Sequence, residues 1–340
     1  MVSSEVDKNR ITVRVFSNYE LGEAEQSRYL TCSSPGCAQY DFRFNKSGRA
    51  HLALVLNFPK LPSWVSVPQG RVVKILQEPI VWNYLTHRFT FKHSALYDSV
   101  RTHNLLGSED ARLIWDHPHL PMHVARNDRR EDKKYLISVI ASRLSVLPGH
   151  KKRDSAVTSL LAGHPELNDH AFGRGRKEIA DKAEGLSKYR YSIAIENDSS
   201  EHYFTEKILD CFESLTVPIY FGAPDIDTFF PPDSFIRLQN LDIESLERAM
   251  LSCSTEDYEA RLPALIEARE LARKYSRLCC LASEVLNEMP QANGLFKPVL
   301  LVPLDTVITF IWRAFISGLR ALRLYRPALA AANKIRSLGL

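Results

Sequence analysis

Side chains suited to binding a charged, hydroxyl-rich ligand gather where a strand pattern gives way to a helix pattern. The apolar run YRYSIAI (189–195) is followed at once by Glu196 and Asn197, and a helical pattern begins shortly afterwards. In open α/β sheets, ligands lie beyond the carboxyl ends of the strands, where the free N–H groups of helix N-termini attract phosphate. Lys207 adds a point charge for a diphosphate, whereas Glu196 and Glu206 suit sugar hydroxyls. The pattern predicts a nucleotide-sugar site.

These residues also have a purely structural explanation. Thr205 can cap the helix, with Glu206 and Lys207 forming its solvated first turn. That explanation is sufficient for any one residue, but it does not account for the whole set, which also includes Tyr203. We therefore interpret the segment as a binding site.

The motif E-N-x5-Y-x-T-E-K at 196–207 resembles the signature of glycosyltransferase family 10, the fucosyltransferases that transfer fucose from GDP-fucose to glycans. The continuation VPIYFGAPDIDTFFPPDSFI (217–236) is also similar to that family. The resemblance is closest across 185–240, is fair across 134–185 and is weak before that. It implies a bacterial-type enzyme with a GT-B fold, in which two Rossmann-like domains face a cleft, and inversion at the transferred carbon.

Two departures from the family pattern concern the acceptor rather than the nucleotide. The chain has Ile195-Glu196-Asn197-Asp198 where the family often has Phe-Glu-Asn-Ser/Thr, and His202 where an acidic residue is common. The nucleotide site is left intact, but these residues weaken a prediction of linkage or acceptor.

Displacement at an anomeric carbon needs a base for the acceptor hydroxyl and a stabilised leaving phosphate. Glu78, at the end of VVKILQEP, is the expected base, with its pKa raised by partial burial; the alternative is that it caps the following turn. In SRLSVLPGHKKRDSAV, Arg153 at a loop-to-helix junction can grip two phosphate oxygens, with Lys152 as a substitute; the alternative is a surface basic cluster. Ser142 and His150 are expected to border the pocket.

The resemblance implies roles for these residues. Glu78 and Glu196 are the expected catalytic residues, the second through a hydrogen bond to fucose that steadies developing positive charge. The expected donor-binding residues are Arg153, Lys152, Asn197, Tyr203, Glu206 and Lys207.

Three other motifs are interpreted as structural. FGRGR (172–176) lacks the third glycine and the preceding strand of a dinucleotide motif, so a turn is predicted there, with Arg174 or Arg176 near GDP. Asp225-Ile-Asp227 resembles a D-x-D metal motif but lies in a proline-flanked loop, which favours a turn. The histidines of HPHLPMH (117–123) lack zinc spacing. No metal or cofactor is predicted to be required, a divalent cation being non-essential, and GDP-fucose is a substrate.

Alternating strand and helix patterns predict an α/β protein with two Rossmann-like domains. Buried strands are predicted at 11–16, 51–56, 71–76, 134–142, 189–195 and 217–222, helices at 154–163 and 205–215, and one long charged helix at 256–288. A charged run at 127–134 marks the boundary. The expected parts are an acceptor-binding domain over 1–130, a GDP-sugar-binding domain over 131–290 and an amphipathic tail over 291–340.

The positive charge is concentrated in the tail. From Lys297 onward there are seven basic residues against one acidic, so the tail carries +6 and residues 1–296 carry −2. Nucleic acid is therefore not an expected partner. Pro303, Asp305 and Arg313 interrupt the apolar stretch, which favours a helix lying on an anionic membrane over one that spans it. The alternative is a helix packed on the body with snorkelling arginine stems.

The N-terminal sequence MVSSEVDKNRITVRVF shows no signal-peptide pattern. The six cysteines match no zinc spacing and predict buried free thiols in a reducing cytoplasm. The expected location is therefore cytoplasmic, with peripheral attachment to the inner membrane face.

The sequence thus predicts an inverting fucosyltransferase that uses GDP-fucose and a saccharide acceptor. The expected product has an α-1,3 linkage, as part of a surface polysaccharide, lipopolysaccharide or other glycosylated molecule. Two alternatives remain open: transfer of another sugar from a GDP donor, and a non-catalytic protein that binds glycans or membranes on the same fold.

Overall fold

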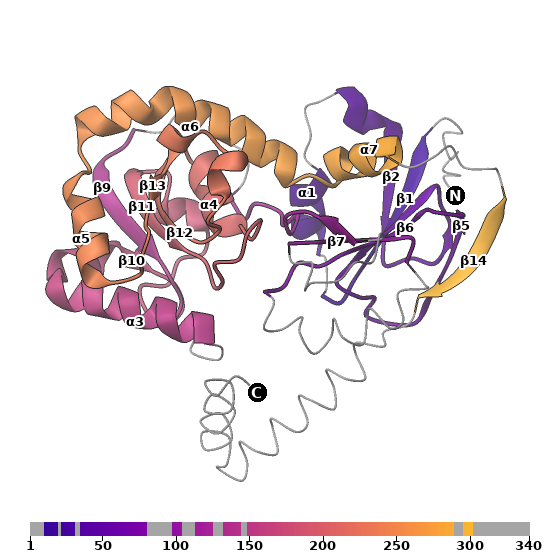
Figure 1. The fold of residues 1–340 in the computed structure, drawn as a ribbon, viewed down its shortest axis with the longest axis horizontal. Helices are drawn as coiled ribbons and strands as arrows, with labels where there is room; N and C mark the ends of the chain where they lie inside the picture. The colour runs from indigo at the N-terminus through magenta and orange to yellow at the C-terminus, as the bar shows by residue number, and fades with distance from the viewer. Residues whose placement is uncertain are drawn as a thin grey trace, which may run out of the picture.

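The structure, a computed structural model, consists of two halves that are each built on a parallel sheet (Figure 1). It describes residues 10–19, 22–30, 35–79, 97–103, 113–124, 132–143, 148–288 and 295–301. The predicted α/β class and the pair of Rossmann-like parallel sheets, the arrangement of a GT-B fold, are confirmed. Of the amphipathic tail expected over 291–340, the stretch Phe296–Leu301 is instead a strand of the first half, and residues 291–294 and 302–340 lie outside the described residues.

The first half contains a six-stranded parallel sheet with the order β2-β1-β4-β6-β7-β8. Its strands are β1 (Ile11–Ser17), β2 (Tyr40–Phe44), β4 (Leu52–Leu56), β6 (Val72–Ile75), β7 (Ser99–Thr102) and β8 (Leu113–Trp115). Every residue of β4 and β6 is buried, as expected for central strands covered on both faces. The predicted strands at 11–16, 51–56 and 71–76 are confirmed.

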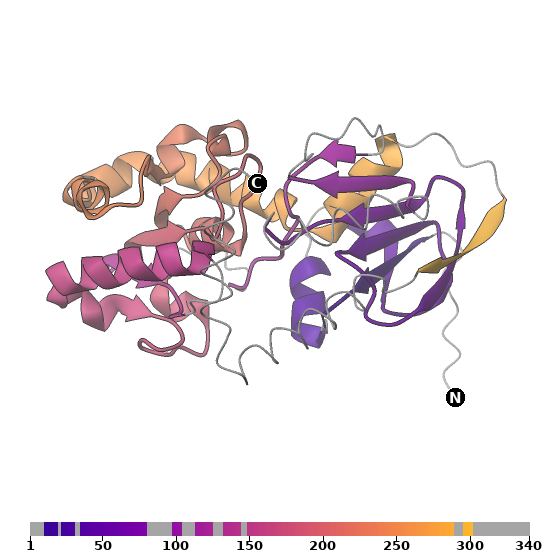
Figure 2. The ribbon, with the colours of Figure 1, turned by 60° about the horizontal axis from the view of Figure 1, so that its bottom comes forward.

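Helices cover one face of this sheet and a second, smaller sheet covers the other. Helices α1 (Glu23–Leu30) and α7 (Leu278–Glu288) pack on the face that carries Val13, Leu54 and Ile75 (Figure 2). The opposite face, with Ala53 and Val55, packs against a three-stranded sheet. That small sheet has the order β14-β5-β3 and is made of β3 (Gly48–Arg49), β5 (Ser63–Pro68) and β14 (Phe296–Leu301).

The second half contains a five-stranded parallel sheet with the order β10-β9-β11-β12-β13. Its strands are β9 (Tyr135–Ile140), β10 (Ala171–Phe172), β11 (Tyr189–Ile195), β12 (Val217–Phe221) and β13 (Ile236–Arg237). Four helices surround it, with α3 and α6 on opposite sides in Figure 1: α3 (Pro148–Gly163), α4 (Glu206–Glu213), α5 (Ile243–Leu251) and α6 (Thr255–Tyr275). The three predicted strands and two predicted helices are found here.

The predicted single helix over 256–288 is wrong, because the chain forms two helices that pack on different halves. Helix α6 ends when the N–H group of Ser276 donates to the carbonyls of Ala272 and Lys274. Helix α7 then joins the core of the first half, and β14 pairs with β5 there. The chain therefore returns to the first half well before residue 290. The domain limits expected from the sequence remain a prediction. They assign α7 to the domain over 131–290, whereas α7 packs on the first half.

The prediction of free thiols is wrong for two cysteines, which form a disulfide. Cys37, in a short 3-10 helix (Pro35–Gln39), is bonded to Cys279 of α7, with 5.4 Å between the Cα atoms. The pairing depends on the return of α7 to the first half, which is why sequence spacing missed it. Cys211, Cys253 and Cys280 are free, and the first two are buried as predicted.

Among the described residues, no helix is long and apolar enough to cross a membrane. The predicted tail helix falls outside the described ranges.

Candidate active site

The strand-to-helix junction predicted from sequence is held together by Glu196. Its buried carboxylate accepts hydrogen bonds from the N–H and hydroxyl of Thr205, at 2.8 and 2.9 Å, and from the Lys207 ammonium at 3.0 Å. Thr205 in turn caps helix α4 by accepting from the N–H of Lys207. Glu196 therefore fixes the start of α4 and the position of the Lys207 charge.

A cavity of about 230 Å³ lies beside this junction, at the carboxyl ends of β9 and β11. It is lined by Ile140, Ala141, Ser142, His150, Arg153, Lys182, Leu186, Ser192, Ile193, Ala194, Asn197, Glu206, Lys207, Asp210 and Cys211. The first turns of helices α3 and α4 both contribute to the lining, so two helix N-termini face the cavity. The volume is below the ~300–1,000 Å³ typical of sites that enclose a whole ligand. The cavity can therefore enclose only part of a ligand as large as a nucleotide sugar.

Arg153 is the cation most available to an anion in the cavity. The residue is buried, its guanidinium donates to Asn197 Oδ1 at 2.5 Å, and its buried Nε has no hydrogen-bond partner. Burial lowers the pKa of Arg153, while Glu196 and Glu206 act in the opposite direction. A buried donor without a partner is costly, and a phosphate oxygen would relieve that cost.

Arg153 and Lys152, its predicted substitute as a phosphate ligand, lie in different environments. Helix α3 begins at Pro148, not near residue 154 as the sequence suggested, so Arg153 lies inside the helix rather than at a junction. Successive helical side chains point in different directions, which turns Arg153 inward and leaves Lys152 exposed. The Lys152 ammonium lies 5.0 Å from the centre of the Phe221 ring.

His150 adds a second unsatisfied group to the cavity wall. Its buried Nδ1 has no hydrogen-bond partner, and it lies in the first turn of α3. Burial lowers the pKa of His150, and the nearby positive charges of Arg153 and Lys207 lower it further. Gly149 brings this turn close to the backbone of Asn197, since a Cβ at Gly149 would lie 1.8 Å from the Asn197 carbonyl oxygen. The sequence analysis placed both Ser142 and His150 at the pocket border, as found.

Lys182 and Asp210 also line the cavity, and sequence reasoning missed them. Lys182 bonds Asp210 at 2.9 Å and approaches Glu206 to 3.7 Å. Burial would raise the pKa of Glu206, but Lys207 and Lys182 hold it well below its usual range. Asp210 was detectable, because it lies four positions after Glu206 on the same face of α4. Nothing in the sequence around Lys182 indicates its role.

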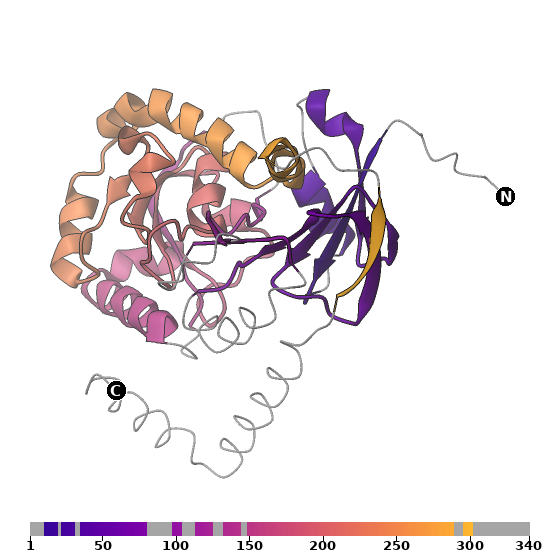
Figure 3. The same cartoon turned by 45° about the vertical axis from the view of Figure 1, so that its right-hand side comes forward.

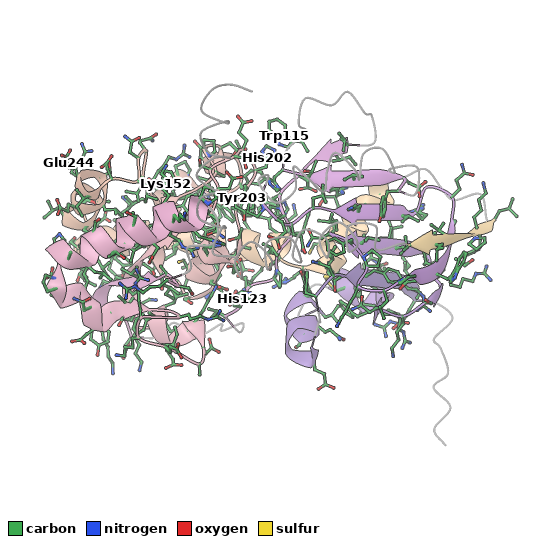
Figure 4. The ribbon with its side chains drawn as sticks, turned by 90° about the horizontal axis from the view of Figure 1, so that it is seen from below. Trp115, His123, Lys152, His202, Tyr203 and Glu244 are labelled. Atoms are coloured by element: carbon green, nitrogen blue, oxygen red, sulfur yellow. A yellow bond between two sulfur atoms is a disulfide. The ribbon has the colours of Figure 1, made fainter. Side chains whose placement is uncertain are left out.

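The loop before α4 packs against the first half through three ring pairs. Trp115 stacks on His202 with 4.2 Å between ring centroids, and His117 stacks on Phe204 at 5.0 Å. His103 contacts Tyr203 at 4.9 Å. Figure 4 shows Trp115, His202 and Tyr203 gathered where the two halves meet. Tyr203, expected at the donor site, is buried in this interface and is not among the residues that line the cavity.

Glu78 follows β6 and faces the same region from the first half. Its side chain reaches solvent, yet the surrounding protein is dense enough for burial to raise its pKa. Lys207 lowers and Glu206 raises that pKa, so the charges at the start of α4 act on Glu78. The predicted base and the predicted phosphate site therefore lie within electrostatic reach of each other.

Two motifs form the turns that were predicted. Gly173 and Gly175 adopt positive φ angles of 125° and 77°, and Arg176 then pairs with Asp154 of α3 at 2.9 Å. The carboxylates of the D-x-D motif diverge: Asp225 pairs with His202 and Asp227 with Arg237, at 2.5 and 2.9 Å.

The histidine run has no zinc spacing, yet the structure brings ligand atoms of Asp116, His117 and His119 within 4.8 Å of one another. Asp116 accepts from both imidazoles and from Arg101, at 2.6 Å for the guanidinium. Burial would raise the pKa of Asp116, but His119 and His117 hold it well below its usual range. His117 also reaches the carbonyl of Tyr275 at 3.2 Å. The Arg101 guanidinium already neutralises the charge of the Asp116 carboxylate. We therefore interpret the cluster as a hydrogen-bonded network between the halves.

The part of the chain that holds this cavity matches a known protein family. Residues 131–260 match the model of the glycosyltransferase family 10 (fucosyltransferase) C-terminal domain. This segment belongs to glycosyltransferase family 10. The cavity, helices α3 and α4, and the motif that begins at Glu196 all lie within the family 10 segment.

Curated relatives match parts of the chain. A fucosyltransferase-like protein of Arabidopsis thaliana is 37% identical over 116 residues, which cover 33% of this chain and 23% of that protein. An α-(1,3)-fucosyltransferase of Helicobacter pylori is 36% identical over 72 residues, covering 21% and 15%. The matched segments thus span less than a quarter of these relatives. A crystal structure of an α1,3-fucosyltransferase with GDP aligns with 85% of this chain and 93% of that chain, at a TM-score of 0.49 and 18% identity.

Proposed function

We propose that this protein transfers fucose from GDP-fucose to a hydroxyl group of a glycan, with inversion at the anomeric carbon. The observation that carries the proposal is the buried Arg153, whose Nε has no partner and which lines a cavity with two helix N-termini in the family 10 segment. Two N-termini and a guanidinium are suited to a diphosphate. The names of the two relatives favour fucose as the transferred sugar, and that of the Helicobacter pylori relative favours an α-1,3 linkage.

The diphosphate is proposed to lie against Arg153 and Lys207. Arg153 has donor capacity left over, whereas the Lys207 ammonium is already shared by Glu196 and Glu206, at 3.0 and 3.4 Å. Arg153 is therefore the principal phosphate ligand and Lys207 a supporting positive charge. His150 supplies a further polar contact from the first turn of α3.

Glu196 is proposed to act mainly by holding Lys207 and the start of α4, because its carboxylate is occupied by Thr205 and Lys207. The contact with fucose expected from the sequence remains a prediction. Asn197 and Glu206 line the cavity and are proposed to position the donor. Tyr203 is proposed to support them from the interface, through its packing against His103.

Glu78 is proposed to remove the proton of the acceptor hydroxyl. The acceptor oxygen then bonds to the anomeric carbon while the bond from that carbon to the phosphate oxygen breaks, and GDP leaves with the electron pair. Only the ionised carboxylate can accept the proton, so a raised pKa moves the acid limb of activity above the usual titration of glutamate.

Replacing Glu78 by glutamine is expected to lower kcat by roughly 10²–10⁴-fold, the usual contribution of a general base. The wild-type kcat/KM should fall as pH drops through the raised pKa of Glu78, and that limb should be absent from the residual activity of the variant. Stopped assays of fucose transfer across acidic and neutral pH measure the loss of kcat and the acid limb of kcat/KM. Glu267→Gln, on the exposed side of α6, is the matched control. Weakened GDP binding by Glu78→Gln, with turnover unchanged at saturation, would contradict the role of base.

The function as a whole is tested by titration calorimetry with GDP-fucose, GDP-mannose and UDP-glucose. We expect binding of the GDP compounds, weakened at least about tenfold (~1.4 kcal/mol) by Lys207→Ala. Transfer of fucose from GDP-fucose to a panel of galactose- and N-acetylglucosamine-containing acceptors should follow. Stronger binding and turnover of GDP-mannose would establish the alternative of another GDP-linked sugar. Lack of binding by all three nucleotides would refute the donor site.

A further inference from the structure

Trp115 presents a partly exposed aromatic ring where the two halves meet. It is the last residue of β8, the edge strand of the first sheet, and it is 45% exposed. Its ring stacks on His202 of the second half, with 4.2 Å between the ring centroids and 7° between the ring planes (Figure 4). The stacking connects the halves and still leaves part of a large apolar ring open to solvent.

The ring of Trp115 is held in one orientation from two sides. Its indole N–H donates to the carbonyl oxygen of His103 at 3.2 Å, and His202 covers one of its faces. His202 itself has a φ angle of 63°, which is uncommon for a residue other than glycine, and its N–H donates to Asp225 at 2.9 Å. Strained backbone that the surrounding structure holds in place is typical of ligand-binding sites. Trp115 is therefore a preorganised apolar surface.

Trp115 and Glu78 lie on the same side of the first sheet, at its carboxyl edge. The registers of β6, β7 and β8 bring Leu76 level with Trp115, and Leu76 packs in the same cluster as Leu113, two residues before Trp115. Gln77 turns to the opposite face, where it donates to a tyrosine of α1. Because side chains alternate along a strand, Glu78 returns to the side of Leu76 and Trp115.

Tyr203 links Glu78 to this ring from the second half. Burial raises the pKa of Tyr203, and nearby carboxylates, those of Glu78 and Asp198 among them, raise it further. Glu78 therefore lies near Tyr203, the residue next to the His202 that stacks on Trp115. The partly exposed carboxylate of Asp198 offers acceptor oxygens for hydroxyl groups in the same region.

An aromatic face beside carboxylates is suited to a sugar ring. The C–H groups on one face of a pyranose carry slight positive charge and pack on the negative face of an aromatic ring, while its hydroxyls donate to carboxylates. Only β7 separates β6 from β8, so Glu78 and Trp115 extend from strands about 10 Å apart. Two linked sugar rings span that separation, and one ring does not.

We propose that the acceptor is a chain of at least two sugars, and that Trp115 stacks on the ring next to the one whose hydroxyl reacts at Glu78. This subsite rests on the proposed function, because it takes Glu78 as the base. The ring of Trp115 then determines which length of acceptor is preferred, whereas the donor lies against Arg153 and Lys207 in the cavity of the second half.

The test compares fucose transfer to galactose and N-acetylglucosamine with transfer to the disaccharides lactose and N-acetyllactosamine. We expect the wild type to prefer the disaccharides. Trp115→Ala should lower that preference, the ratio of the two kcat/KM values, by about tenfold (~1.4 kcal/mol), chiefly through a higher KM for the disaccharide. Trp115→Leu fills more of the space without an aromatic face and should act as Trp115→Ala does. Trp115→Tyr keeps an aromatic ring and should recover most of the preference.

Trp64→Ala is the matched control. Trp64 is 57% exposed and belongs to β5 of the small sheet. That sheet lies at the edge of the first half remote from the second half (Figures 1 and 3). A surface substitution there should keep the wild-type preference within about twofold.

Four outcomes would contradict the subsite. Absence of a disaccharide preference in the wild type, or an equal loss with monosaccharides and disaccharides in the Trp115 variants, would leave the ring a structural role only. A rise confined to the KM for GDP-fucose would assign the ring to the donor. Failure of all four sugars to accept fucose, while GDP-fucose binds in calorimetry, would remove the subsite and leave the donor site standing. Lack of nucleotide binding would instead refute the proposed function.

Discussion

Replacing Arg153 by alanine is expected to weaken binding of GDP by roughly a hundredfold or more, about 3 kcal/mol. The guanidinium is buried, fixed by Asn197 at 2.5 Å and has an Nε without a partner, so its donors are already oriented for an anion. Charge-assisted, forked hydrogen bonds of this kind contribute about twice as much as neutral ones. Titration calorimetry with GDP measures the loss.

Two variants separate the charge of Arg153 from its geometry. Arg153→Lys keeps the charge but removes the fork, and we expect it to recover only part of the affinity. Lys152→Ala, one position earlier on α3, removes an exposed ammonium and should change affinity by no more than about twofold. A larger loss with Lys152→Ala than with Arg153→Ala would mean that the diphosphate binds outside the cavity.

Replacing Glu213 by glutamine is expected to lower the free energy of unfolding of the second half by about 3–5 kcal/mol. Glu213 of α4 accepts two hydrogen bonds from Arg273 of α6, at 2.7 and 2.6 Å, and both side chains are buried. Removing one charge leaves the other buried without its full counter-charge, which is costly. Urea denaturation followed by circular dichroism measures the change.

The contribution of burial is tested by two comparisons. The double variant Glu213→Leu with Arg273→Met removes both charges and should be more stable than Glu213→Gln. Arg261→Ala breaks a partly exposed pair with Asp257 at 2.7 Å, also on α6, and should cost no more than about 1 kcal/mol. Equal losses from Glu213→Gln and Arg261→Ala would refute the importance of the buried pair.

These two predictions concern neighbouring parts of one unit. Helix α4 begins at the cavity with Glu206 and Lys207 and ends at Glu213, where the ion pair ties it to α6. Helix α6 leads directly to α7, which packs on the first half. The position of the cavity relative to Glu78 therefore depends on contacts made far from the cavity itself.

The sequence alone determined the features that depend on neighbours along the chain. Branched apolar runs marked the strands of both sheets, because a buried parallel strand is apolar on both faces. The junction at 196–207 was also readable, since cap, helix start and charged first turn are set by adjacent residues. Glu196, Thr205 and Lys207 are bonded to one another within that short segment.

Only the tertiary structure decided which distant groups meet. The choice of Arg153 over Lys152 depended on where α3 begins and which side of it faces the cavity. Lys182 reaches Asp210 from a short 3-10 helix (Lys182–Gly185), and Cys37 meets Cys279 across 242 residues, because of how helices pack on the two sheets. Periodicity records whether a side chain is buried, but it does not record against which element. That is also why one expected helix proved to be two, each packed on a different half.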